Sequence, residues 1–482
     1  MFLKIFFLAL ALVSILPHVQ AETNPLDAFK RAGVSAEGVG LYALALDQIT
    51  PKFAHNAETA LILASTTKVM TSVAALDVLG PAFKWHTNAF VNGKLENGIL
   101  AGDLLIVGGG DPLLDSTKLT TWFAQLQKRG VKEIAGNIVL DRQRFSLNEK
   151  DHANTPKPDW RNTHHALPDA LVIDGGMLKV KISNVADKKV ISFEPALDGI
   201  DIVDQTKSIN RCAANKAPIS VEFDETSANR KVIVSGEWAN DCTAVVVEIN
   251  PFDMQTFSAA AVLSAWKAAG GSLTGQVIDT PAPNTVKLKL GAKPPRAAKP
   301  RRPFAILESA QLLDAIKQVN KWSNNLVSRN VLLTLSPGFP NVPATLAGAQ
   351  TNIANWLKTR GFSEADLTVE NGSGLSRNER GKPRALAELL RDVSFSKIDK
   401  VFRSSLSVAG LDGTMGGRLK RVDMAGKVLL KTGTLTDVRA VAGYVTGKSG
   451  QVYAVVALVN HPNATRAVPA IDAFVEWVYS NG

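Results

Sequence analysis

The chain has few of the residues that hold metals or cofactors. Its 482 residues include two cysteines and seven histidines, and the histidines are scattered without the spacing of metal ligands. His164 and His165 are adjacent and would point to opposite faces of any strand. There is no Gly-x-Ser-x-Gly elbow, and Gly443 and Gly447 are separated by three residues, where a phosphate loop needs four. We therefore expect no metal and no cofactor.

Long apolar runs are also missing beyond the N-terminus. Met1–Ala21 carries one lysine, then the apolar run Ile5–Leu16, then Val19–Ala21 ahead of Glu22. This order is typical of a secretory signal peptide with a small-residue cleavage site. The run is shorter than the roughly 20 residues that a spanning helix needs, so cleavage is favoured over a permanent anchor. We expect export to the periplasm and a mature chain that begins near Glu22.

The cysteines and the charge fit such a compartment. Cys212 and Cys242 lie in one region rich in strand-like sequence, and an oxidising compartment favours one disulfide between them over two free thiols. The formal charge of +10 suits peripheral contact with an anionic cell wall or membrane, because net charge governs association. We do not expect nucleic acid as a partner, because we expect the protein to be exported. The basic, Pro-rich stretch Pro281–Pro303 could touch such a polymer, although charged loops are usually only solvated.

The pattern of apolar and turn-forming residues changes along the chain and predicts an insertion. Val39–Leu46 is typical of a buried strand, and Thr66–Leu79 of a helix that is apolar almost all round. Short strand patterns separated by Gly, Asn and Asp turns fill residues 86–251. We expect one unit made of residues 22–85 and 252–482, interrupted at 86–251 by a β-rich region with two nested subdomains. The insertion could instead extend to the Pro-rich stretch near residue 300.

Three short motifs carry side chains that can act together. Ser65–Lys68 places a hydroxyl and an amine three residues apart at the start of the buried helix, where such side chains share a face. A serine hydroxyl is a weak nucleophile unless a base takes its proton, which a lysine can do when its pKa is lowered. Ser323–Asn325 adds a second hydroxyl and a carboxamide, and Lys431–Thr434 follows the apolar strand Val428–Leu430.

Each motif alone is weak evidence. The Ser-x-x-Lys spacing recurs at Ser264–Lys267 and Ser394–Lys397, and the bare Ser-x-Asn pattern occurs at four other places. Lys-Thr-Gly occurs once, since Lys448–Gly450 is only a near copy that is typical of a hairpin turn. The order and context of the three motifs carry the prediction, because all of them would have to coincide by accident.

With these motifs the chain resembles the class C low-molecular-weight penicillin-binding proteins. This is the penicillin-binding protein 4 family (peptidase family S13) of D-alanyl-D-alanine carboxypeptidases and endopeptidases. The likeness runs nearly end to end and includes Gly109–Pro112, Asn371–Ser376 and Leu411–Thr414. It implies an α+β fold with a serine β-lactamase/penicillin-binding transpeptidase-like domain. That domain is an antiparallel five-stranded sheet flanked by helices and interrupted by β-rich inserted domains.

The resemblance also implies a role for each motif residue. Ser65 would attack the carbonyl of the penultimate D-Ala while Lys68 takes its proton, which gives an acyl-enzyme. Ser323 would relay the proton to the leaving amine. Asn325 would hold Lys68 and the substrate amide. Lys431 would meet the substrate carboxylate and help to keep Lys68 neutral.

Substrate binding is implied for the segment after Lys431. Thr432, Gly433 and Thr434 would line the bound peptide, and the amides of Ser65 and Thr434 would form the oxyanion hole. The implied partners are peptidoglycan stem peptides and β-lactam antibiotics, which mimic the D-Ala-D-Ala end. A β-lactamase and a non-catalytic wall-binding protein are the rival interpretations. The sequence predicts neither the oligomeric state nor a preference between carboxypeptidase and endopeptidase activity.

Overall fold

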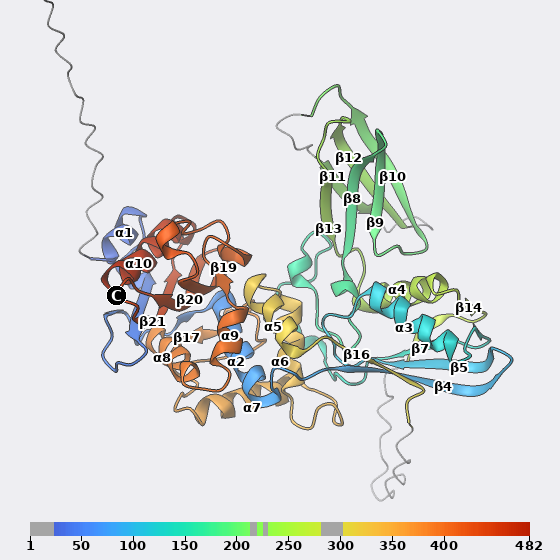
Figure 1. Cartoon of the computed structure of the whole chain (residues 1–482), viewed down its shortest axis with the longest axis horizontal. Helices are drawn as coiled ribbons and strands as arrows, with labels where there is room; N and C mark the ends of the chain where they lie inside the picture. The colour runs from blue at the N-terminus through green and yellow to red at the C-terminus, as the bar shows by residue number, and fades with distance from the viewer. Residues whose placement is uncertain (1–23, 213–218, 225–229, 281–301) are drawn as a thin grey trace, which may run out of the picture.

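The computed structural model describes residues 24–212, 219–224, 230–280 and 302–482. The expected signal peptide and most of the basic, Pro-rich stretch lie outside these residues. Within them the chain forms a helix-and-sheet unit from both ends of the sequence and an insertion from the middle (Figure 1). No helix in the described ranges is long and apolar enough to cross a membrane.

A six-stranded antiparallel sheet forms the centre of the first unit. In spatial order its strands are β18 (Ser407–Val408), β19 (Val428–Leu435), β20 (Val438–Thr446), β21 (Val452–Asn460), β1 (Val39–Ala45) and β2 (Phe53–His55). This is one strand more than expected, because the two-residue β18 pairs with Leu429 and Leu430 of β19. A strand of that length leaves no periodic pattern in the sequence.

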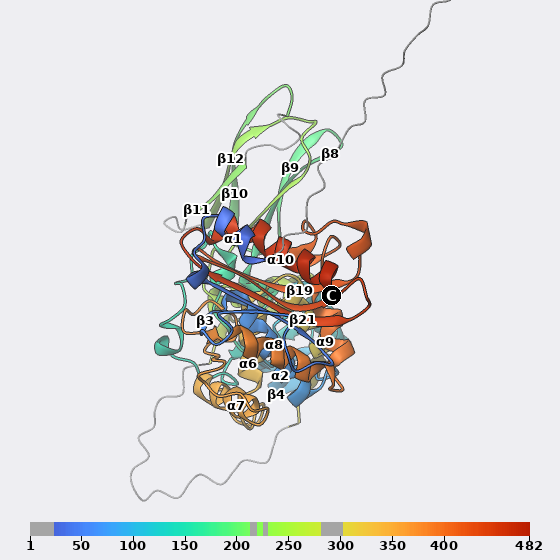
Figure 2. The same cartoon turned by 90° about the vertical axis from the view of Figure 1, so that its left-hand side faces the viewer.

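Helices cover both faces of this sheet because its strands are apolar on both sides. Along β1, Tyr42 and Leu44 pack into one hydrophobic cluster, whereas Leu41 and Ala43 pack into another. Figure 2 shows α1 (Leu26–Arg31) and α10 (Val468–Asn481) on one side of the sheet. The other side carries α2 (Lys68–Leu79), α5 (Leu312–Lys321), α6 (Asn325–Thr334), α7 (Leu346–Lys358), α8 (Pro383–Ser394) and α9 (Asp399–Ser405). The short strands β3 (Leu61–Ile62) and β17 (Arg380–Gly381) pair beside them.

The insertion contains two β-rich parts. The first is a seven-stranded sheet of β4 (His86–Glu96), β5 (Ile99–Val107), β6 (Glu133–Ile134), β7 (Ile138–Asp141), β14 (Ser272–Leu273), β15 (Val277–Asp279) and β16 (Ala305–Glu308). Against it pack α3 (Ser116–Lys128) and α4 (Met254–Ala268). The second part holds two three-stranded sheets, β13 (Val245–Ile249) with β8 (Leu178–Val185) and β9 (Lys188–Glu194), and β10 (Ile200–Ser208) with β12 (Arg230–Trp238) and β11 (Ile219–Asp224).

The insertion extends farther along the chain than residue 251. Trp266 of α4 packs edge-on against Phe123 of α3, with ring centroids 5.5 Å apart, in the core of the insertion. After the Pro-rich stretch, β16 still pairs with β4 of the insertion. These contacts favour the later of the two ends expected for the insertion, the one near the Pro-rich stretch.

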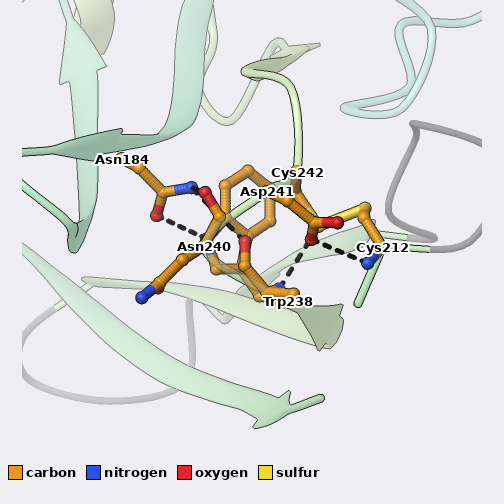
Figure 3. The surroundings of a disulfide bond; sticks show 7 residues. Asn184, Cys212, Trp238, Asn240, Asp241 and Cys242 are labelled. Atoms are coloured by element: carbon orange, nitrogen blue, oxygen red, sulfur yellow. Dashed lines mark hydrogen bonds between the residues drawn. A yellow bond between two sulfur atoms is a disulfide. The ribbon is translucent and has the colours of Figure 1, made fainter. Parts of the chain in front are cut away.

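Cys212 and Cys242 form a disulfide in the second part of the insertion (Figure 3). The bond joins the segment after β10 to the turn after β12, and the two cysteines are 30 positions apart in the sequence. The Cys212 N–H donates to Asp241 Oδ1 at 2.8 Å. Beside it, Trp238 Nε1 donates to Asn184 Oδ1 of β8 at 2.9 Å. The cross-link thus lies where the two three-stranded sheets meet.

Candidate active site

Ser65 lies in a single 3₁₀ turn, Ala64–Thr67, that leads directly into α2. Lys68, the first residue of α2, is fully buried, and its Nζ donates a hydrogen bond to Ser65 Oγ at 2.9 Å. The three-residue spacing therefore brings the two groups together, as such spacing does in helices. Ser65 remains partly accessible, so the hydroxyl can meet a substrate while the amine is shielded from water.

Two further segments surround the amine of Lys68. It donates to Asn325 Oδ1 at 2.7 Å and to the backbone carbonyl of Ser373. Ser65 Oγ also faces that carbonyl, at 3.4 Å. Asn325 is the first residue of α6, and its Nδ2 donates to the backbone carbonyl of His164 in the insertion at 3.0 Å. The Asn325 carboxamide therefore links the lysine to the insertion.

Ser323 and Lys431 form a second hydrogen-bonded pair. Lys431 is fully buried, and its Nζ donates to Ser323 Oγ at 2.9 Å and to the Thr432 carbonyl at 2.8 Å. Ser323 has a φ of 59°, a left-handed conformation that costs energy in a residue with a side chain. This backbone turns the chain between α5 and α6, and it presents the hydroxyl to the lysine.

The segment Lys431–Thr434 runs along an open edge of the sheet. β18 pairs with β19 only as far as Leu430, so the following residues have no strand on that side within the described ranges. Gly433 lies close to the nucleophile turn, because a Cβ at Gly433 would be 3.1 Å from the Ser65 nitrogen. Thr432 Oγ1 donates to Thr414 Oγ1 at 2.8 Å. The backbone amide of Ser65 thus lies next to a strand edge that can pair with an extended peptide.

Comparison with known proteins places the chain in a family. A match to the D-Ala-D-Ala carboxypeptidase 3 (S13) family spans residues 27–480. The chain belongs to the S13 family. It is 26% identical over 426 residues to the D-alanyl-D-alanine carboxypeptidase DacB of Haemophilus influenzae, which covers 88% of this chain and 85% of that protein. It is also 26% identical over 409 residues to a D-alanyl-D-alanine carboxypeptidase of Actinomadura sp., with 81% and 72% covered.

Solved structures share the fold of this S13 peptidase. The crystal structure of penicillin-binding protein 4 from Haemophilus influenzae matches with a TM-score of 0.74 at 24% identity, covering 95% of this chain and 100% of that one. A peptidoglycan endopeptidase of Bdellovibrio bacteriovorus matches with a TM-score of 0.53 at 15% identity, covering 91% and 92%. The predicted family, fold class and hydrolase class are therefore confirmed.

Burial controls the protonation of the two lysines in the S13 site. It lowers the pKa of Lys68 to about 7, and the negative charge of Glu379 opposes this decrease. Burial also holds the pKa of Lys431 well below its ordinary value, and the neighbouring charge of Lys68 lowers it further. An amine with a pKa near 7 is neutral in a large fraction of molecules at neutral pH. Lys68 can therefore accept a proton from Ser65, which an exposed lysine cannot do.

The structure groups the side chains that the sequence singled out and adds others. The predicted residues fall into two hydrogen-bonded groups, Ser65 with Lys68 and Asn325, and Ser323 with Lys431. Sequence reasoning missed the carbonyls of Ser373 and His164, the hydroxyl of Thr414 and the carboxylate of Glu379. Ser373 and Thr414 lie in segments that carried the family likeness. A backbone carbonyl belongs to every residue, however, so the type of residue does not indicate that its carbonyl takes part in a site.

No cluster of three or more metal-ligating side chains occurs in the described ranges.

Proposed function

We propose that this S13 peptidase hydrolyses D-alanyl bonds in peptidoglycan stem peptides through an acyl-enzyme on Ser65. The hydrogen bond from the buried Lys68 amine to Ser65 Oγ carries the proposal. A neutral lysine in that position can take the hydroxyl proton while the oxygen attacks a carbonyl carbon. The names of the carboxypeptidases from Haemophilus influenzae and Actinomadura sp. refer to the same class of bond.

The acylation step uses both hydrogen-bonded groups. Ser65 Oγ bonds to the carbonyl carbon of the penultimate D-Ala, and its proton moves to Lys68 Nζ. Ser323, which accepts a hydrogen bond from Lys431, gives its hydroxyl proton to the leaving nitrogen as the C–N bond breaks and takes up the proton that Lys68 received, so that Lys68 is neutral again. The N–H groups of Ser65 and Thr434 stabilise the oxyanion. Water then attacks the ester, releases the shortened peptide and restores the Ser65 hydroxyl.

Substrate binding falls to the open edge of β19. An extended peptide can pair with the edge beyond Leu430, where Thr432, Gly433 and Thr434 present their backbone groups. The carboxylate of the substrate would bring a negative charge beside Lys431 and would favour its protonated form, which offsets the effect of burial on its pKa. A β-lactam carries a similar carbonyl and carboxylate, so we propose that penicillin acylates the same oxygen. The Haemophilus influenzae protein has been crystallised with a β-lactam.

We also propose that the enzyme acts in the periplasm after export by the signal peptide Met1–Ala21. Two observations support this location. Cys212 and Cys242 are joined in a disulfide, a bond that forms and persists in oxidising compartments. The net charge of +10 favours peripheral association with an anionic wall or membrane surface.

A penicillin-labelling experiment tests the proposed nucleophile. The purified mature chain is mixed with penicillin, its intact mass is recorded, and the adduct is mapped by peptide digestion. We expect one adduct on Ser65 that is absent from Ser65→Ala. Ser72→Ala is the matched control, because this buried hydroxyl on α2 bonds Asn320 instead of the lysine and its loss should leave the adduct unchanged.

The outcomes separate the rival functions. A stable Ser65 adduct, followed by release of D-Ala from stem peptides, supports the peptidase. An adduct that hydrolyses within seconds would instead indicate a β-lactamase. A chain that forms no adduct, or forms one on another residue, would contradict the mechanism and favour a wall-binding protein without catalysis.

A further inference from the structure

A buried carboxylate lies behind the loop that supplies the Ser373 carbonyl. Glu379 has no exposed surface. Its two oxygens accept hydrogen bonds from four backbone N–H groups, at distances of 2.6 to 3.0 Å, those of Glu370, Asn371, Gly372 and Gly374. Hydrogen bonds from N–H groups to an ionised carboxylate are stronger than those between neutral groups. One side chain therefore fixes the backbone of a whole loop.

That loop reaches the catalytic groups at successive residues. The Gly372 carbonyl accepts from Thr71 Oγ1 of α2 at 2.8 Å. The next carbonyl, that of Ser373, accepts from Lys68. Gly374 has a φ of 85°, and a Cβ there would lie 2.0 Å from the Ala64 carbonyl, just before the nucleophile. The loop packs closely against the turn Ala64–Thr67 that carries Ser65. The path of the loop backbone therefore limits where the Lys68 amine can lie.

We propose that Glu379 is a positioning residue for acylation. Its carboxylate holds the loop so that the Ser373 carbonyl meets the Lys68 amine, and it places a negative charge among the buried cations around that amine. The inference rests on the proposed role of Lys68 as the base for Ser65. It assigns two separable effects to one side chain, a geometric effect and an electrostatic effect.

The charges around Glu379 support the second effect. Lys68 of α2 and Arg329 of α6 are the cations whose pKa values its charge raises. The charge of Lys68 in turn lowers the pKa of Lys431 of β19. Arg329 is 3% exposed, and its guanidinium is hydrogen-bonded to His152 Nδ1 and to the Ala166 carbonyl. Glu379 thus supplies the negative charge for a buried group of cations.

The protonation state of Glu379 follows from two opposing causes. Burial raises its pKa to about 7, and the four amide donors lower it. A proton on either oxygen would have to compete with N–H donors that already occupy both oxygens. The loop geometry therefore belongs to the ionised carboxylate, and a neutral side chain at this position would lose the charge and weaken the hydrogen bonds from the amides.

The test measures penicillin acylation of the full mature chain as a function of pH. Glu379→Gln removes the charge and replaces one acceptor by a donor, whereas Glu379→Asp keeps the charge on a shorter side chain. Glu370→Gln is the matched control, because it removes a carboxylate from the same loop whose bonds go to Asn154 and Ser376. Wild type is measured first, so that failure of Ser65 acylation itself is recognised separately.

The two variants should separate the two effects. We expect the maximal rate to fall at least about tenfold in both, because small displacements of catalytic groups are costly. Only in Glu379→Gln should the acid limb of the rate move, to a pH lower by about one unit. That variant has neither the carboxylate that takes up a proton near pH 7 nor the anion that favours protonated Lys68. Glu370→Gln should keep the wild-type acid limb. Wild-type rates and pH profiles in both Glu379 variants would overturn the proposal. If Glu379→Gln does not fold, a Glu379→Asp variant with the wild-type maximal rate would also overturn it.

Discussion

The central sheet of the first unit and the sheet of the insertion that contains β9 differ in how far their residues are exposed to water. In the first unit, β20 and β21 are buried along almost their whole length, with helices on both faces. In the insertion, β9 has no buried residue and alternates between exposed and half-buried positions. Only a sheet covered on both faces can seclude amines from water. The proposed chemistry therefore lies in the first unit, whereas the outer sheets of the insertion are stabilised by the Cys212–Cys242 cross-link.

The largest effect should come from removing the buried amine. Lys68→Met keeps an unbranched side chain in the same space, but Ser65 loses its base. We expect the rate of penicillin acylation to fall by about 10²–10⁴-fold, measured as the rate constant of adduct formation. Lys267→Met is the control, because Lys267 shares the Ser-x-x-Lys spacing but is exposed and paired with Asp198. Equal rates for Lys68→Met and wild type would show that another group is the base.

That pair of lysines also shows what the sequence could predict. Ser65–Lys68 and Ser264–Lys267 have the same spacing, and the motif alone does not separate them. The apolar character of Thr66–Leu79 predicted burial around the first, and the structure has Lys68 fully buried. On α4, Lys267 remains exposed. Side-chain chemistry and helix periodicity were therefore enough to predict that Ser65 and Lys68 meet and that the amine is buried.

The rest of the site depends on contacts that periodicity does not encode. Ser373 contributes a carbonyl, and Glu379 contributes bonds to backbone amides, so neither residue type indicates its partner in advance. The end of the insertion stayed open between residue 251 and the Pro-rich stretch for a similar reason. β16 joins the insertion by pairing with β4, more than 200 positions earlier in the chain. Tertiary pairing over such a separation leaves no local signal.

Removing the Cys212–Cys242 cross-link should have the second largest effect. It should lower the stability of the insertion alone. In a Cys212→Ser, Cys242→Ser double variant, we expect the insertion to lose about 3 kcal/mol of unfolding free energy, because the unfolded chain gains the entropy of an open loop. Urea unfolding followed by Trp238 fluorescence, with the other tryptophans replaced by phenylalanine in both proteins, measures this loss. The acylation rate should not change. A large decrease in that rate would show that the two units depend on each other for stability.

A matched pair of valines compares the two kinds of sheet directly. Val456 of β21 is fully buried between the helical layers, whereas Val190 of β9 is 37% exposed. Val456→Ala should lower the free energy of unfolding of the first unit by about 2 kcal/mol, because a cavity forms in a packed core. Val190→Ala should change the stability of the insertion by about 0.5 kcal/mol or less. Similar losses from both substitutions, measured by hydrogen exchange in each unit, would contradict the proposed difference in burial.

The last expected effect requires no substitution: the acylation rate should change with pH because of the same burial. Because burial lowers the pKa of Lys68 to about 7, the amine is protonated below that pH and cannot accept the Ser65 proton. The acylation rate should therefore fall about tenfold for each pH unit below 7 and reach a plateau above it. Lys267 lies on the surface of α4, where it pairs with Asp198, so Lys267→Met should show the same profile as wild type. A rate that stays flat down to pH 5.5 would mean that Lys68 is not the base. A rate that keeps rising well above pH 7 would mean that water reaches its amine, because hydration raises the pKa of a lysine.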